Sequence, residues 1–117
     1  MTQTVVPQFR ITDEQRSTAF YVGGLGFAID WQHRFEPGFP VFMQLTRAGQ
    51  TIFLTEHAGD CQVGGAAYFV VPDVDACYQE FVGRGLAGIE RPQDTPWDTR
   101  EMVLRDPDGN SLRFASN

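Results

Sequence analysis

The stretch of sequence that decides the fold is PWDTREMVLRDPDGNSLRF, residues 96–114. It predicts a β-hairpin, with one strand on each side of a turn at residues 106–110. Pro107 sets the backbone φ at the start of this turn, and Gly109 allows the positive φ that a tight reversal needs. The hairpin is therefore predicted to complete a β-sheet at the end of the chain.

The second half of this hairpin has a counterpart sixty residues earlier in the chain. Residues 108–112, DGNSL, align with residues 48–52, AGQTI, so that a turn glycine precedes a polar, a hydroxyl and an aliphatic residue in both stretches. The same shift lays residues 69–73, FVVPD, on residues 9–13, FRITD. Because one constant shift aligns separate stretches, the sequence indicates an internal duplication.

Each half of the sequence is predicted to form one βαβββ unit. The predicted strands lie at residues 5–11, 27–35, 41–46 and 51–55 in the first half and at residues 66–71, 86–90, 99–105 and 111–115 in the second. The predicted helices begin at Thr12 or Asp13 and at Asp73, and they end near Val22 and at Gly85. The predicted fold class is α+β: one domain, residues 1–117, made of two repeats, about 1–57 and 64–117. Helices cover the outside of a curved, half-open mixed sheet whose other face surrounds a pocket.

Composition and charge exclude several classes of protein. With 42% hydrophobic and 21% charged residues the chain is predicted to be ordered. It has no run of about 18 apolar residues, so no membrane span is predicted. The net charge of -6 argues against nucleic acid as a partner, because binding to phosphates needs clustered Lys and Arg. Without a basic, hydrophobic leader to indicate secretion, the expected location is the cytoplasm.

Four segments resemble a known superfamily. They are FRITDEQRSTAFYVGGLGF (9–27), TIFLTEHAGD (51–60), VVPDVDACYQEF (70–81) and the hairpin stretch 96–114. Together they resemble the vicinal oxygen chelate superfamily of glyoxalases, bleomycin resistance proteins and extradiol dioxygenases. Within it, the Pro-Trp pair at residues 96–97 and the turn at residues 105–110 are similar to the bleomycin-resistance branch.

The resemblance implies where a metal would bind. Enzymes of the superfamily hold a divalent metal through inward-facing residues on the first and fourth strand of each half, which here correspond to Val6, Phe53, Ala66 and Arg113. None of these is His, Glu, Asp or Gln, whereas Zn²⁺, Ni²⁺ and Fe²⁺ need imidazole, carboxylate or thiolate ligands. We therefore expect no metal and no other cofactor.

Residues for catalysis are sparse in the sequence. His33 and His57 lie in separate segments, without a second ligand at the spacing of a strand or helix site, and no Ser lies in a G-x-S-x-G motif. The carboxylates Asp30, Glu56 and Glu101 could approach a pocket. The chain is expected not to be an enzyme, and two alternatives stay open. One is a metal-dependent lyase or dioxygenase of the same fold, and the other is a metal-free enzyme that uses these carboxylates.

Aromatic side chains are the feature predicted for the pocket. They are Trp31, Phe35, Phe39, Phe42 and Phe53 in the first half and Tyr68 and Trp97 in the second. Strand alternation places Tyr68 on the pocket face and Phe69 in the core. Trp97 stands in a proline-rich loop where no periodicity requires burial, so both a binding role and a structural role are open to it.

The bleomycin-resistance branch holds flat heteroaromatic antibiotics between aromatic side chains, in grooves at the interface of a strand-swapped dimer, and leaves them chemically unchanged. The resemblance implies ligand contacts from Asp30, Trp31, His33, Thr55, Tyr68, Trp97 and Asp98, and we add the other aromatic residues named above and Arg113. The chain differs from the branch at Asp98, where glycine is usual, and in the length of its loop at residues 36–40. The expected function is sequestration, by a homodimer, of a planar and possibly cationic antibiotic of the bleomycin or a related natural-product class.

Overall fold

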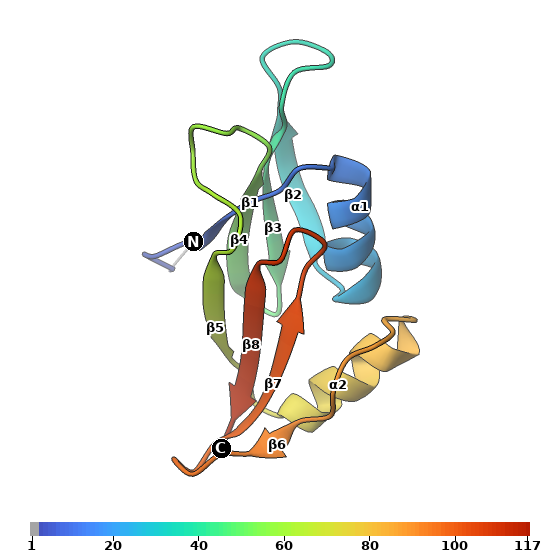
Figure 1. Cartoon of the computed structure of the whole chain (residues 1–117), viewed down its shortest axis with the longest axis vertical. Helices are drawn as coiled ribbons and strands as arrows, with labels where there is room; N and C mark the ends of the chain where they lie inside the picture. The colour runs from blue at the N-terminus through green and yellow to red at the C-terminus, as the bar shows by residue number, and fades with distance from the viewer. Residues whose placement is uncertain (1–2) are drawn as a thin grey trace.

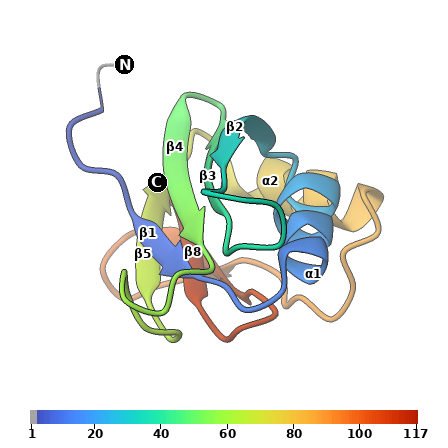
Figure 2. The same cartoon turned by 90° about the horizontal axis from the view of Figure 1, so that it is seen from above.

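Both halves of the chain fold as a strand, a helix and three further strands. In this computed structural model, which describes residues 3–117, the first half contains β1 (Gln8–Arg10), α1 (Glu14–Thr18), the π-helical turn η1 (Ala19–Gly24), β2 (Ala28–His33), β3 (Phe42–Arg47) and β4 (Gln50–Thr55). The second half contains β5 (Ala66–Val70), α2 (Val74–Gly83), β6 (Gln93–Asp94), β7 (Arg100–Arg105) and β8 (Ser111–Ser116). The helices α1 and α2 lie on the same side of the molecule, beside the strands (Figure 1 and Figure 2).

The strands form two open, mixed, four-stranded sheets, in the orders β1-β4-β3-β2 and β5-β8-β7-β6. In each sheet the first strand of the half runs parallel to the last strand. Gln8 is level with Phe53 in the first sheet, and Tyr68 is level with Arg113 in the second. Both residues of the second pair lie sixty positions after those of the first, so the two sheets share one register. The predicted α+β fold of tandem βαβββ units is confirmed.

Both helices begin at an aspartate. The carboxylates of Asp13 and Asp73 accept hydrogen bonds of 3.1 Å from the backbone N–H of Arg16 and Ala76, respectively. Each bond satisfies one of the free donors in the first turn of its helix. The predicted helix starts are therefore confirmed at Asp13 and Asp73.

The first helix ends differently from the prediction. It continues past Val22 as η1, in which the N–H of Leu25 donates to the C=O of Phe20, five residues back, at 3.0 Å. This bond makes the last turn wider than an α-helical turn. Gly24 lies where a Cβ atom would come within 3.1 Å of the Leu86 side chain, so the wide turn brings its backbone against the second half of the chain.

One hydrophobic core runs through both halves. Phe69 is 6% exposed and stacks on Phe114 at 4.8 Å between ring centroids, whereas its neighbour Tyr68 is 51% exposed. Phe27 of the first half meets Phe69 edge to face at 6.4 Å, so the core joins the two sheets. The predicted alternation, with Phe69 in the core and Tyr68 on the open face, is confirmed.

The turn at residues 106–110 fastens the second half to the first. Asp106 accepts hydrogen bonds from the Tyr21 hydroxyl at 2.7 Å and from the backbone N–H of Asn110 at 2.8 Å. The Asn110 amide donates to the C=O of Arg10 at 2.9 Å, and the Asp108 carboxylate accepts from the backbone N–H of Thr12 at 3.2 Å. Burial and the neighbouring Asp106 carboxylate raise the pKa of Tyr21, so this phenol stays protonated and donates. The motif that identifies the fold is thus also a link between its halves.

One predicted strand is wrong. Residues 86–90 form no strand; instead Gln93 and Asp94 pair with β7 as the short strand β6. Leu86 and Ile89 pack against the core as isolated apolar side chains, and Gly88 between them adopts a φ of 76°. This positive φ turns the chain away from the extended conformation that pairing with β7 requires. The first strand is also shorter than predicted, because it pairs only over Gln8–Arg10.

Candidate functional site

The open face of the first sheet carries an aromatic cluster, which consists of Trp31, Phe42 and Phe53. Trp31 stacks on Phe42 with 5.9 Å between ring centroids, and Phe53 lies 6.1 Å from Trp31 and 5.1 Å from Phe42. The strand register explains the cluster, because Trp31 and Phe53 are both level with Gln44 of β3. Trp31 is 44% exposed, so a planar molecule could stack on its free surface.

A β-bulge places a carboxylate beside this aromatic cluster. The register of β2 against β3 shifts between Ile29 and Trp31, and the extra residue is Asp30. Its carboxylate accepts hydrogen bonds from the Thr46 hydroxyl at 2.5 Å and from the Gln44 amide at 3.0 Å. These two bonds, that of Thr46 first, lower the pKa of Asp30. The first open face therefore combines aromatic rings with a fixed negative charge.

A second group of rings lies beyond the ends of β2 and β4. Phe35 meets His33 edge to face at 5.1 Å and His57 at 6.2 Å. Phe35 and Phe39 are exposed, and the C=O of Phe39 accepts a hydrogen bond from Arg34 at 2.8 Å. The structure thus places Phe35 against His33, the last residue of β2, and against His57, whereas Phe39 lies further along the loop that follows β2.

The open face of the second sheet centres on Glu101. Its carboxylate accepts hydrogen bonds from the Trp97 indole at 3.0 Å, the Thr99 hydroxyl at 2.7 Å, the Arg113 guanidinium at 3.2 Å and the Tyr68 hydroxyl. Glu101 is 8% exposed, although Trp97 and Tyr68 themselves are 59% and 51% exposed. The carboxylate therefore holds two aromatic side chains in fixed positions and leaves their surfaces accessible. We call these five residues the Glu101 cluster.

Hydrogen bonding sets the charge of the Glu101 cluster. The bonds from Tyr68 and Trp97, with smaller contributions from Thr99 and Arg113, lower the pKa of Glu101 to about 2. The same bond to Glu101 raises the pKa of the Tyr68 phenol. Glu101 is therefore ionised and Tyr68 protonated at neutral pH, and Arg113 balances the charge of the carboxylate.

A tight turn carries Trp97 to this position. The hydroxyls of Thr95 and Thr99 lie 2.8 Å apart, and the N–H of Thr95 donates to the C=O of Thr99 at 2.8 Å. Between them Asp98 has a φ of 67°, in the left-handed region that favours glycine. Asp98 is the residue at which the chain differs from the glycine usual in the bleomycin-resistance branch. Its backbone still has the positive φ that glycine adopts most easily, and Asp tolerates this φ better than most residues.

Thr55 lies apart from the accessible site residues. It is fully buried, its hydroxyl donates to Asp60 at 2.7 Å, and the same oxygen accepts from the N–H of His57 at 3.1 Å. This hydroxyl organises the start of the loop between the halves. Asp98, by contrast, is exposed at the tip of the turn after Trp97.

The sequence interpretation treated Glu101 only as a candidate acid and did not identify Thr99 or Gln44. A signal for Thr99 and Glu101 was present, because alternation along residues 99–103 puts both on the face of Val103, which is level with Arg113. The bond between Trp97 and Glu101 crosses a turn, so no strand periodicity could have indicated it.

The residues at the superfamily's metal positions do not fit a metal. The sequence predicts Val6, Phe53, Ala66 and Arg113 at these positions, and two of the four are wrong: the residues paired with Phe53 and Arg113 are Gln8 and Tyr68, two positions after Val6 and Ala66. A ring, a guanidinium, one amide and a phenol bonded to a carboxylate do not make a ligand set for a divalent transition metal. Over residues 3–117, moreover, there is no group of three or more His, Cys, Asp or Glu side chains arranged to hold a metal ion.

No helix within residues 3–117 is both long enough and apolar enough to cross a lipid bilayer.

Comparison with known proteins agrees with this fold. A bleomycin-binding protein solved in complex with bleomycin superposes with a TM-score of 0.76 at 26% identity, covering 99% of both chains. A bleomycin resistance determinant encoded on transposon Tn5 gives a TM-score of 0.77 at 26% identity, covering 99% of this chain and 98% of that one. TnmS3, an antibiotic binding protein from Streptomyces sp. CB03234, gives 0.74 at 24% identity over 99% and 98% of the two chains. A search of curated protein sequences gave no significant match. The sequence profile of the glyoxalase superfamily matches residues 1–117, and the chain belongs to that superfamily.

Proposed function

We propose that this protein is a metal-free binding protein that sequesters an aromatic antibiotic, of the bleomycin or a related natural-product class, without modifying it. The observation that carries the proposal is the pair of open faces. One presents the aromatic cluster with Trp31 44% exposed, and the other presents Trp97 and Tyr68 held by Glu101. Soluble proteins seldom leave large rings fixed and uncovered unless another molecule covers them. Two of the similar structures, at 26% identity, are described as a bleomycin-binding protein and a bleomycin resistance determinant.

We propose that the protein assembles as a homodimer through the same surfaces. Each open face supplies only one wall of a groove, so a second copy that brings its Glu101 cluster opposite the aromatic cluster would complete the site. The segment before β1 contains Val5, which is 79% exposed, and Pro7, which has no N–H to pair. We propose that this segment exchanges between two copies and that the groove lies at their interface.

The charges favour a cationic, planar ligand. Asp30 and Glu101 both have lowered pKa values and are therefore ionised, and Asp98 is exposed beside Trp97. Arg113 is already paired with Glu101, so the local balance is negative, like that of the whole chain. Stacking on the rings would provide affinity, and the carboxylates would attract a positively charged tail.

The lowered pKa of Glu101 also weakens the case for a metal-free enzyme. A general base works best with a pKa near the working pH, and a carboxylate with a pKa of about 2 is a poor proton acceptor at neutral pH. Asp30 is shifted in the same direction. Hydrogen bonding thus lowers the basicity of two of the three candidate carboxylates, and we propose that the protein acts in the cytoplasm by binding alone.

The test is a binding screen with mass spectrometry. Bleomycin and a panel of planar natural products are titrated while tryptophan fluorescence is followed, and each binder is then recovered and weighed. The proposal expects saturable quenching by at least one compound and its recovery with unchanged mass. A compound that is converted to a product, or a panel without any binder, would contradict it.

A further inference from the structure

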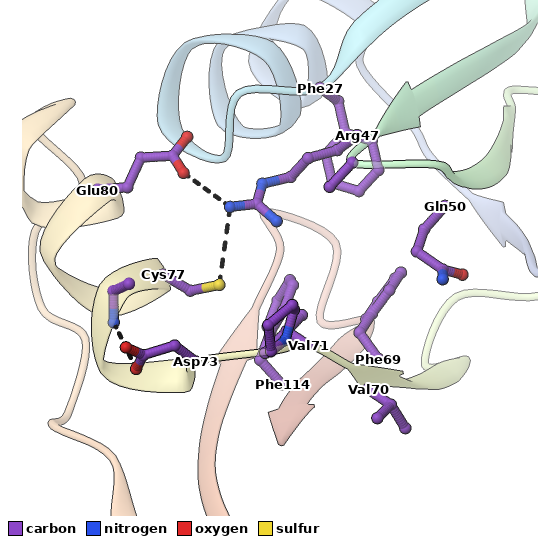
Figure 3. Close-up of a pocket in the computed structure, with 13 residues that line it drawn as sticks. Phe27, Arg47, Gln50, Phe69, Val70, Val71, Asp73, Cys77, Glu80 and Phe114 are labelled. Carbon is purple, nitrogen blue, oxygen red and sulfur yellow. Dashed lines mark hydrogen bonds and ion pairs between the residues drawn. The ribbon is translucent and has the colours of Figure 1, made fainter. Parts of the chain in front are cut away.

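A cavity lies away from both open faces, where the turn between β3 and β4 meets the end of β5 and the first turns of α2 (Figure 3). Its volume is about 270 Å³. Phe27, Phe69 and Phe114 line it with Cys77, and Arg47 enters from β3. None of its lining residues belongs to the aromatic cluster or to the Glu101 cluster.

The shared register of the two halves explains why this space is open. In the second half, the five-residue turn between Arg105 and Ser111 packs against the junction of β1 and α1. In the first half, β3 and β4 are joined by Ala48 and Gly49 alone. The turn that faces the junction of β5 and α2 is therefore shorter by three residues, and the cavity occupies the space that its counterpart fills.

The polar groups at the junction also differ between the halves. Thr12 donates its backbone N–H to Asp108 at 3.2 Å, and the residue sixty positions after Thr12 is Pro72, which has no N–H. Ala48 stands where the second half has Asp108. The second half therefore lacks the backbone donor at Pro72, and the first half lacks the carboxylate acceptor at Ala48. The open space thus leaves no backbone N–H unpaired at Pro72.

Arg47 is held rigidly at the wall of the cavity. Its Nε donates to the C=O of Leu25 at 2.9 Å, its Nη2 donates to Glu80 at 2.7 Å, and its guanidinium lies 5.1 Å from the centre of the Phe81 ring. Nη2 also lies 3.7 Å from the sulfur of Cys77. The side chain is 13% exposed, yet Nη1 forms no hydrogen bond with any residue between 3 and 117. One edge of a fixed guanidinium is thus free to donate.

We infer that this cavity is a second small-molecule site, which binds a neutral aromatic molecule carrying a carbonyl oxygen. Its volume exceeds the roughly 150 Å³ that holds a benzene ring in a protein core, so one substituted ring fits. Three phenyl rings provide apolar contacts, and Nη1 of Arg47 donates to the carbonyl oxygen. The carboxylates of Glu80 and Asp73 line the same cavity and outnumber the one guanidinium, which disfavours an anionic ligand.

The inference is tested with acetophenone as the probe, followed by amide NMR of the full-length protein. Two matched compounds serve as controls: α-methylstyrene has the same shape without the oxygen, and benzoate carries a negative charge. Saturable shifts are expected at Val71 and Cys77 and not at the indole N–H of Trp31 or Trp97. Acetophenone should bind at least about tenfold more tightly than α-methylstyrene, because the guanidinium hydrogen bond is lost with the oxygen, and more tightly than benzoate.

Three variants locate the site. Arg47→Met should weaken acetophenone binding about tenfold and leave the affinity for α-methylstyrene nearly unchanged. Ala76→Leu adds a helix-compatible side chain to the cavity wall and should abolish binding of both compounds. Gln79→Leu makes the same kind of change on an exposed part of α2 outside the cavity and should have no effect. If Arg47→Met does not fold, the last two variants and the compound comparison still decide the matter.

Several results would overturn the inference. Absence of saturable shifts, or shifts only at Trp31 and Trp97, would mean that the cavity takes no such ligand. Equal affinity for acetophenone and α-methylstyrene would refute the role of Arg47, and tighter binding of benzoate would refute the charge argument. Resonances of Val71 and Cys77 that change with protein concentration and resist the probe would show that a second copy of the chain fills the cavity instead.

Discussion

Replacing Trp97 by Ala separates a role in binding from a role in folding. Trp97 is 59% exposed, so the folded chain covers only about two-fifths of an indole that buries roughly 200 Å² when fully enclosed. At about 25 cal/mol per Å², the lost burial of roughly 80 Å² amounts to at most about 2 kcal/mol of stability. If the indole is a wall of the groove, binding should weaken by about 1 to 3 kcal/mol.

Phe69→Ala is the matched control, because it removes a buried ring of the core, whereas Trp97→Ala removes an exposed ring. Phe69 is 6% exposed and stacks on Phe114, so its loss should cost about 3 to 5 kcal/mol of stability. Urea denaturation gives the two stabilities, and quenching of Trp31 fluorescence by the screened ligand gives the affinities. The reasoning is refuted if Trp97→Ala destabilises the protein as much as Phe69→Ala does and leaves the affinity of the folded protein unchanged.

Further predictions concern the Glu101 cluster, the turn, metal and assembly. Glu101→Gln should lower the raised pKa of Tyr68, measured by ultraviolet titration against Tyr68→Phe as the reference, and should weaken ligand binding because a single neutral amide oxygen cannot accept from all four groups that donate to the carboxylate. Because the folded pKa of Glu101, about 2, lies below its usual value, the stability that its ionised form provides is present above about pH 4.3 and is lost as the pH falls toward 2; acid denaturation of Glu101→Gln should lack this loss. Asp98→Gly should stabilise the protein by about 0.5 kcal/mol in urea, since relief of the left-handed φ of 67° exceeds the added chain entropy only slightly, and destabilisation would show that the Asp98 side chain makes a contact of its own. Elemental analysis should find no transition metal in stoichiometric amount, and a metal held by side chains of this chain would contradict the binding-protein proposal. Light scattering at micromolar concentration should give the mass of a dimer, and a monomer would count against a shared groove.

Much of the frame could be predicted from the sequence because it depends on local rules. The shift of sixty residues correctly predicted that Phe53 and Arg113 occupy equivalent places in the two sheets, but the residues predicted beside them, Val6 and Ala66, lie two positions before their actual partners, Gln8 and Tyr68. Alternation separated Phe69 from Tyr68 in the same way, since neighbouring residues on a strand face opposite sides of the sheet. These predictions needed only pattern and position.

The site depended on interactions that no local rule contains. The bulge at Asp30 changes which residues of β2 face the open side, and the Asp30 carboxylate bonds there to Gln44 and Thr46 of the neighbouring strand β3. The strand predicted at residues 86–90 failed for a similar reason, because its two apolar side chains pack on the core without a paired neighbour. Contacts between residues far apart in the sequence decide both details. The local sequence pattern does not contain these contacts, and at residues 86–90 it favours a strand that does not form.

The duplication explains why two sheets with the same fold carry two different surfaces. Phe53 of β4 and Arg113 of β8 occupy equivalent positions in the two sheets. Their partners on the neighbouring strands, Gln8 and Tyr68, are equivalent in the same way. At this place the first half has a ring that joins an aromatic cluster, whereas the second has a guanidinium that pairs with Glu101. Residues that face the open side do not support the core, so they can change while the buried residues maintain the fold. The first face offers a cluster of rings for stacking, the second offers two rings held by a carboxylate, and in the proposed groove the two faces would contact a planar ligand from opposite sides.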